Sequence, residues 1–222
     1  MPVSLFDDTE WHVVEVALEP QRGGATVVSL DLDNGEYTGS ATIEDFALPT
    51  PAFLGFTGRT GGANNLHWAR AISTGTRTTI QATPAAIPRP PSTRLDAAAF
   101  TLGGDAALGD GGVLQLTGVA NSQQGTAFYQ LDIDAFDRFH TQFDMYTGDG
   151  TGADGLCVNV GAADLGGRFG EDGVAQGVAL CFDEWANDGD HGVEIMYNGS
   201  PVWQELASCG NRQGCDPVSW FE

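Results

Sequence analysis

The sequence predicts an all-β fold, a β-sandwich or jelly roll built from antiparallel strands. Glycine accounts for 31 of the 222 residues, which is about double its usual share of ~7%. Short segments rich in β-branched and aromatic residues recur every ~8–15 residues and are separated by Gly-containing turns. No segment has the period of a convincing helix, and only residues 203–207 are compatible with a single helical turn. Many short strands joined by tight turns are typical of a sandwich.

The individual strands follow from runs or alternations of apolar residues. Gly23-Gly24 and Asp33-Asn34-Gly35 are turn signals. A third Gly-rich loop, Arg59-Thr60-Gly61-Gly62, lies between two strand candidates. Strands are expected at residues 11–18, 25–31, 52–58, 66–72, 112–118, 125–133, 138–146, 154–160, 177–185 and 191–199.

The composition divides the chain into three segments. Residues 1–75 consist of strands and turns, and strands resume over residues 97–222. Between them, residues 76–96 hold four of the ten prolines, at positions 84, 88, 90 and 91, and three arginines. This segment has no period and few large apolar groups, so an extended, polyproline-like linker is expected.

The chain ends with nearly the same residues as those with which it begins. Residues 2–7 read PVSLFD and residues 217–222 read PVSWFE. One explanation is that the chain is about one period of a tandem array, cut at an arbitrary phase. A circular permutation is the other explanation.

The charge of the chain excludes some partners. The formal net charge is −21 at pH 7, so nucleic acid and anionic lipid would be repelled. Hard cations would be attracted, and calcium prefers clusters of carboxylate and carbonyl oxygens. A general role of the acidic residues in solubility is the alternative. No stretch approaches the ~20 apolar residues of a membrane helix, so membrane insertion is not expected.

The cysteines indicate an oxidising compartment. The chain has four cysteines, an even number, and none of them form a CxxC motif: Cys157, Cys181, Cys209 and Cys215. This pattern favours disulfides over a zinc site. An extracellular or cell-surface location follows. The first residues do not form a signal peptide, so a piece of a secreted chain is expected. Asn198-Gly199-Ser200 is a glycosylation sequon, which has meaning only if a eukaryote secretes the protein.

Two stretches resemble the L-type (legume-type) lectins. Gly152-Ala153-Asp154-Gly155-Leu156, followed by GVALCFDEWANDGDHGVEI at residues 177–195, is similar to the Ala-Asp-Gly strand and the metal-binding strand of that family. FLGFTGRTGGANNLHW at residues 53–68 is similar to the family's late strand and Gly-rich sugar loop. The resemblance implies a concanavalin A-like jelly-roll sandwich. The two stretches stand in the opposite order from ordinary members, as the terminal repeat would allow.

The resemblance implies a calcium site at the end of the strand 177–185. Its ligands would be Asp183, the carbonyl oxygen of Trp185, Asn187, and either Asp188 or Asp190, because the loop is shorter than in the family. Calcium wants six to eight oxygens, which such a loop can supply. The alternative is a polar turn held by Asx hydrogen bonds. The family's second metal is not expected, because Cys181 replaces its glutamate although His191 matches its histidine.

The resemblance also implies a carbohydrate site. Asp154, Asn187 and a backbone amide of Gly61 or Gly62 would bind the sugar, and an aromatic side chain would stack on its apolar face. Trp185, Tyr197 and Trp203 are candidates for stacking. The alternatives are an ordinary turn at Asp154 and a plain hairpin at Gly61-Gly62. His12, His67 and His140 are expected to be surface or satisfied core groups.

Two disulfides are expected. Cys157 would pair with Cys181, because the strands that carry them would be antiparallel and adjacent. Cys209 would pair with Cys215 across a short loop.

No enzyme is expected. The related glucanases carry both carboxylates on one strand of the type Glu-x-Asp-x-x-Glu, and that pattern is missing, as is Gly-x-Ser-x-Gly. Asp183 and Glu184 are adjacent, so they point to opposite faces of a strand.

Two functions remain. The first is an extracellular calcium-dependent lectin-like domain that binds a glycan. The second is a structural building block of a fibre or adhesin, in which neighbouring copies of the repeat complete each other's sandwich.

Overall fold

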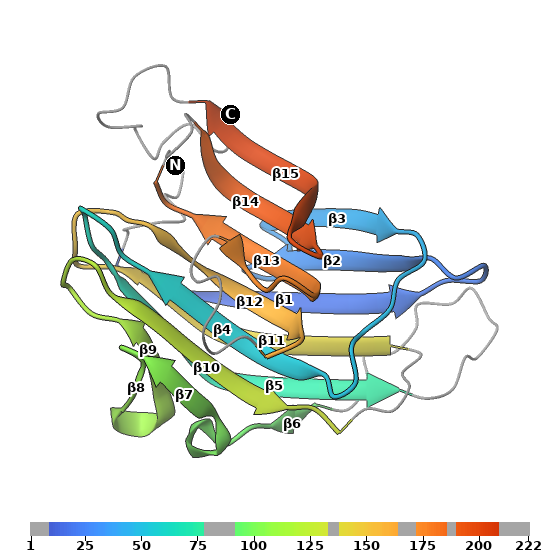
Figure 1. The fold of residues 1–222 in the computed structure, drawn as a ribbon, viewed down its shortest axis with the longest axis horizontal. Coiled ribbons are helices and arrows are strands. Elements are labelled where there is room, and N and C mark those ends of the chain that lie inside the picture. The colour runs from blue at the N-terminus through green and yellow to red at the C-terminus, as the bar shows by residue number, and fades with distance from the viewer. Residues whose placement is uncertain (1–8, 78–91, 133–137, 164–171, 186–189, 209–222) are drawn as a thin grey trace.

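The strands form two antiparallel sheets that pack face to face (Figure 1). The computed structural model describes residues 9–77, 92–132, 138–163, 172–185 and 190–208. The first sheet is eight-stranded, in the order β3-β2-β1-β11-β5-β9-β8 with β6 beside β5, and the second is seven-stranded, in the order β15-β14-β13-β12-β4-β10-β7. The strands are β1 (Trp11–Pro20), β2 (Thr26–Leu32), β3 (Tyr37–Ile43), β4 (Phe53–Arg59), β5 (Leu66–Arg77), β6 (Thr93–Arg94), β7 (Thr101–Gly104), β8 (Ala107–Gly109), β9 (Val113–Thr117), β10 (Gln124–Gln130), β11 (Arg138–Gly148), β12 (Gly155–Gly161), β13 (Gly177–Asp183), β14 (Asp190–Tyr197) and β15 (Ser200–Ser208).

The predicted all-β sandwich is confirmed, and each predicted strand overlaps a strand of the structure. The structure contains two short 3-10 turns, Ala97–Ala99 and Asp110–Gly112. The turn predicted at Asp33-Asn34-Gly35 joins β2 to β3, and all three residues have positive φ.

The expectation of a helical turn at residues 203–207 is wrong, because these residues belong to β15. A tight turn at Asn198 and Gly199, both with positive φ, folds β15 back onto β14. The inter-strand pairing overrides the local helical preference of Gln204, Glu205 and Leu206.

The two sequence segments interleave in both sheets of this single chain. In the first sheet β11 lies between β1 and β5, and in the second β4 lies between β12 and β10. The strand β5 extends to Arg77, and β6 pairs with it through Thr93 and Arg94, so strand residues occupy both ends of the segment expected to be a linker. Residues 78–91, which hold its four prolines, lie outside the described residues.

The core is formed by the inward side chains of both sheets. On β2, Val28 and Leu30 face inward and alternate with more exposed neighbours, as the period of a strand requires. Phe56 of β4 contacts Phe143 of β11 edge-to-face, with ring centroids 4.9 Å apart. Each fully buried side chain of this size contributes roughly 1.5–3 kcal/mol.

An aromatic contact joins the sheets along one edge. Tyr37 on β3 and Trp203 on β15 have ring centroids 6.4 Å apart, and the Tyr37 hydroxyl donates to Glu205 at 3.0 Å. Burial and the neighbouring Glu205 carboxylate raise the pKa of Tyr37. The indole lies over Gly39, where a Cβ would come within 2.6 Å of the ring. Glycine therefore stands at this inward position of β3 because a larger side chain would collide with the indole of Trp203.

Candidate functional site

Connections that are distant in sequence meet at one end of the sandwich, on the left of Figure 1. Residues 60–65 join β4 to β5, residues 118–123 join β9 to β10, and residues 149–154 join β11 to β12. Ser122 N–H donates to the Gly61 oxygen at 3.0 Å, and Thr151 N–H donates to the Asn64 oxygen at 2.6 Å. The start of the β13–β14 connection joins them, because Glu184 N–H donates to the Asp154 oxygen at 2.9 Å. We call this region the loop cluster.

Asp154 lies in the middle of the loop cluster and is 6% exposed. Its backbone N–H donates to the Arg59 oxygen at 2.9 Å, and its Oδ2 lies 3.3 Å from Arg59 Nε. The peptide bond between Ala153 and Asp154 is cis. Burial raises the pKa of Asp154, and the Glu184 charge acts in the same direction, while Arg59, His67 and the Gly61 N–H oppose it. The fold therefore places a carboxylate where its ionised form is costly.

Gly61 of the Gly-rich loop contacts the Asp154 carboxylate. Its backbone N–H bonds the Asp154 carboxylate, and a Cβ at this position would lie 2.9 Å from Oδ1 and 3.0 Å from Oδ2. A Cβ on Gly62 would meet no atom within 4 Å. The side-chain amide of Asn121 donates to the Gly62 oxygen at 2.8 Å and accepts from Asn64 Nδ2 at 2.6 Å, which holds the loop in place.

Glu184 lies behind Asp154 in a buried network that the sequence analysis did not predict. Its side chain is 2% exposed. Oε2 accepts from Asn65 Nδ2 at 2.9 Å and lies 3.2 Å from His67 Nε2. His67 is fully buried, and its Nδ1 lies 2.7 Å from Thr117 Oγ1. Asn65 precedes β5 and His67 lies at its start, while Thr117 ends β9 and Glu184 follows β13, so no local pattern could have joined them.

The donors and acceptors of this network can be assigned. Thr117 donates its single hydroxyl hydrogen to the Asn65 oxygen at 2.9 Å, so its oxygen accepts from His67 Nδ1. The Oδ1 of Asn65 accepts from Gly150 N–H at 3.1 Å, which turns its Nδ2 toward Glu184.

The predicted calcium loop is only partly described. Asp183 ends β13, and its Oδ1 accepts from the Trp185 N–H at 2.9 Å, as in an Asx turn. Asn187 and Asp188 lie outside the described residues, as do the side chains of Asp190 and His191. Among the side chains that are described, no three or more His, Cys, Asp or Glu come together as a metal site.

Of the three aromatic candidates, Trp185 alone adjoins the loop cluster. It follows Glu184 and is 41% exposed. Tyr197 lies at the other end of β14, where it packs against Phe46 with ring centroids 5.5 Å apart and accepts the Ala47 N–H. Trp203 packs on Tyr37 at the sandwich edge.

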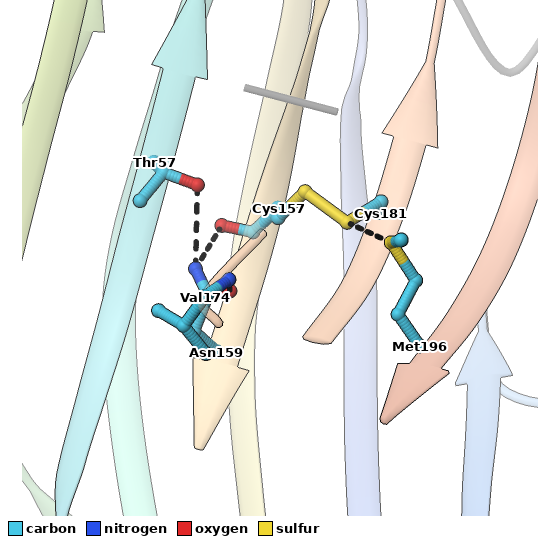
Figure 2. The surroundings of a disulfide bond; sticks show 6 residues. All are labelled: Thr57, Cys157, Asn159, Val174, Cys181 and Met196. Atoms are coloured by element: carbon cyan, nitrogen blue, oxygen red, sulfur yellow. Dashed lines mark hydrogen bonds between the residues drawn. A yellow bond between two sulfur atoms is a disulfide. The ribbon is translucent and has the colours of Figure 1, made fainter. Parts of the chain in front are cut away.

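The predicted Cys157–Cys181 disulfide is confirmed, with an S–S distance of 2.11 Å. The two cysteines are register partners on β12 and β13, and both are fully buried (Figure 2). Asn159 beside them donates to Thr57 Oγ1 at 3.3 Å and accepts from Val174 N–H at 3.0 Å. Two residues further along the same strands, Gly155 pairs with Asp183. The disulfide therefore holds together the strand ends next to Asp154 and Glu184.

Cys209 and Cys215 lie outside the described residues. Asn198 is exposed in the β14–β15 turn, where its Oδ1 accepts from Gly177 N–H at 2.9 Å. His12 lies 2.7 Å from Asp33 Oδ2, and His140 lies 3.0 Å from Ser92 Oγ, so both strand histidines have polar partners as expected.

No protein-family model matches the chain, and a search of curated proteins finds no significant relative. No helix among the described residues is long and apolar enough to cross a membrane. What the structure itself shows is an all-β sandwich with a loop cluster around a buried aspartate.

Proposed function

We propose that the chain is an extracellular lectin-like domain of the concanavalin A-like jelly-roll class, and that it binds a glycan at the loop cluster with the help of calcium. The observation that carries the proposal is the contact between Asp154 and Gly61. Residues about ninety positions apart, singled out for sugar binding in two separate stretches of the sequence, lie side by side in the structure.

The chemistry of the loop cluster suits a sugar. An ionised Asp154 accepts hydrogen bonds from neighbouring hydroxyl groups, and its pairing with Arg59 and the Gly61 N–H fixes its direction. The exposed ring of Trp185 provides an apolar surface for the C–H face of a pyranose. Asn187 would add an amide at the same strand end.

Calcium is part of the proposal through the lectin resemblance. Asp183 and the Trp185 carbonyl supply oxygens of the right kind at the end of β13, and Asn187 with Asp188 or Asp190 would complete the set. When bound, the ion would hold the β13–β14 connection against Asp154. The buried disulfide supports an extracellular location. The terminal repeat supports an array of such domains on a surface protein.

The test is a glycan array probed with wild type, Asp154→Ala and a matched pair of glycine variants. Gly61→Ala puts a methyl group against the Asp154 carboxylate, while Gly62→Ala enters open space. We expect Asp154→Ala and Gly61→Ala to lower affinity for the bound glycan by roughly tenfold or more, and Gly62→Ala to bind as wild type.

Calcium and chelator arms complete the experiment. Binding should require calcium and be lost in chelator. If folded wild-type protein binds no glycan in either condition, the carbohydrate proposal fails and the domain is better understood as a building block of a fibre. Equal binding by the two glycine variants would move the site away from Asp154.

A further inference from the structure

The Glu184 carboxylate has one oxygen in use and one without a partner. Oε2 is occupied by Asn65 and His67, but Oε1 is buried and has no hydrogen-bond partner in the described part of the chain. A buried, unpaired carboxylate oxygen costs more than a typical hydrogen bond returns. In water such an oxygen binds a solvent molecule, which a ligand can displace if it supplies an equivalent donor.

The described surroundings of Glu184 leave no side-chain donor to spare for this oxygen. Asp154 is adjacent, and its carboxylate already takes up the Arg59 guanidinium and the Gly61 N–H. Asn65 and His67 both point at Oε2. The sequence contains no lysine, and its net charge is −21. The two basic groups at these carboxylates, Arg59 and His67, are both already engaged, so the described part of the site offers no free cation to an acidic ligand.

We propose that Glu184 is a second ligand-binding carboxylate of the loop cluster, and that it selects glycans which present hydroxyl or ammonium donors and excludes acidic ones. This inference rests on the proposed carbohydrate function and adds the chemical class of the glycan. Glu184 and Asp154 would accept from donors on the same sugar. His67, Asn65 and Thr117 act as positioning residues, because they hold the carboxylate from behind.

The first test uses wild-type protein with calcium and matched pairs of glycans. Each neutral oligosaccharide is compared with its counterpart that carries a uronic acid, a sialic acid or a sulfate. The array is run at about 0.15 M and about 0.5 M salt, because added salt screens the long-range repulsion from the net charge. We expect binding within the neutral or amine-bearing class only, and continued exclusion of the acidic counterparts at the higher salt.

The second test compares Glu184→Gln with Glu44→Gln. Glu44 is exposed in the connection after β3, so its variant removes the same charge away from the loop cluster. Glu184→Gln should weaken binding of the neutral glycan by roughly tenfold or more and reduce the discrimination against its acidic counterpart. Glu44→Gln should change neither. Circular dichroism and melting curves establish that both variants are folded.

The outcomes separate the two proposals. Acidic glycans that bind as tightly as neutral ones at the higher salt would overturn the role of Glu184 and leave the lectin proposal standing, and this result needs no variant. Unchanged affinity and selectivity in folded Glu184→Gln would do the same. Absence of binding to every probe would overturn both.

Discussion

Asp154 is a residue whose proposed role in binding comes at the expense of stability. It is buried beside a second carboxylate, and Arg59 and the Gly61 N–H only partly compensate. The net result is a raised pKa, so the folded state prefers the neutral acid more than the unfolded chain does. Binding sites often contain groups whose charge is not at its most stable there.

A pH dependence follows from this raised pKa. The stability contributed by Asp154 is fully present below its ordinary pKa of about 3.9 and is lost as pH rises through the raised folded-state value. Asp154→Asn, which is neutral at every pH, should therefore melt at a higher temperature than wild type at pH 7, and this gain should shrink toward pH 3. The measurement is thermal unfolding of both proteins at the two pH values.

Under the proposed function, glycan binding should have the opposite pH dependence, because the ionised carboxylate is the form that accepts hydrogen bonds from sugar hydroxyl groups. The charged neighbours that set its midpoint are Arg59, His67 and Glu184. We expect affinity to fall, on acidification, at a pH above the ordinary aspartate value. A lower melting temperature of Asp154→Asn at pH 7 would contradict this account of Asp154.

At the scale of elements, the disulfide and the strand pairing fix the strands that carry the site. Cys157 and Cys181 are separated by 24 residues in sequence and lie opposite each other on β12 and β13. Gly173 and Val174, which precede β13, lie against the outer face of these strands, and Val174 N–H donates to Asn159. Both faces of β12 are therefore buried, although only one faces the sandwich core.

Removal of this disulfide should destabilise the domain. A disulfide that closes a loop of this length stabilises the folded state by about 3 kcal/mol, because it lowers the conformational entropy of the unfolded chain. In a domain of this size that corresponds to a melting temperature lower by roughly 6–12 °C. The measurement compares the double variant Cys157→Ala, Cys181→Ala with wild type, and includes Glu44→Gln as a control at an exposed position. Identical melting curves for the double variant and wild type would contradict a stabilising role.

The elements that the sequence predicts well are those whose pattern is local. The strands around residues 11–18 and 138–146 have clear apolar runs, and the cysteine pairing follows from two adjacent strands. By contrast, β3 carries Gly39 where an indole packs on it, and β15 contains residues that favour a helix. The motif residues Asp154 and Gly61 could be proposed from the sequence. Glu184, Asn65 and Thr117 could not, because only the folded sheets bring them together.

At the scale of the whole molecule, the dominant feature is its negative charge. Thirty acidic residues face nine arginines, which gives the net charge of −21. Arg59, Arg70 and Arg138 form ion pairs with Asp154, Asp144 and Glu19. Most carboxylates are therefore left to repel one another across the surface, which destabilises a compact state.

Salt should therefore stabilise the protein. Between about 0.01 M and about 0.5 M sodium chloride, the Debye length falls from ~30 Å to a few ångströms, so repulsion between surface carboxylates is screened. We expect the melting temperature to rise by several degrees, since about 1 kcal/mol corresponds to roughly 2–4 °C in a domain of this size. Calcium at millimolar concentration should add a further rise at constant ionic strength if the β13–β14 connection binds it, because a ligand stabilises the state that binds it. A melting temperature that falls as sodium chloride is added would mean that the ion pairs outweigh the repulsion. The same melting temperature with calcium and with an ionic-strength-matched amount of sodium chloride would leave the acidic surface as the whole explanation, and calcium would have no role in this domain.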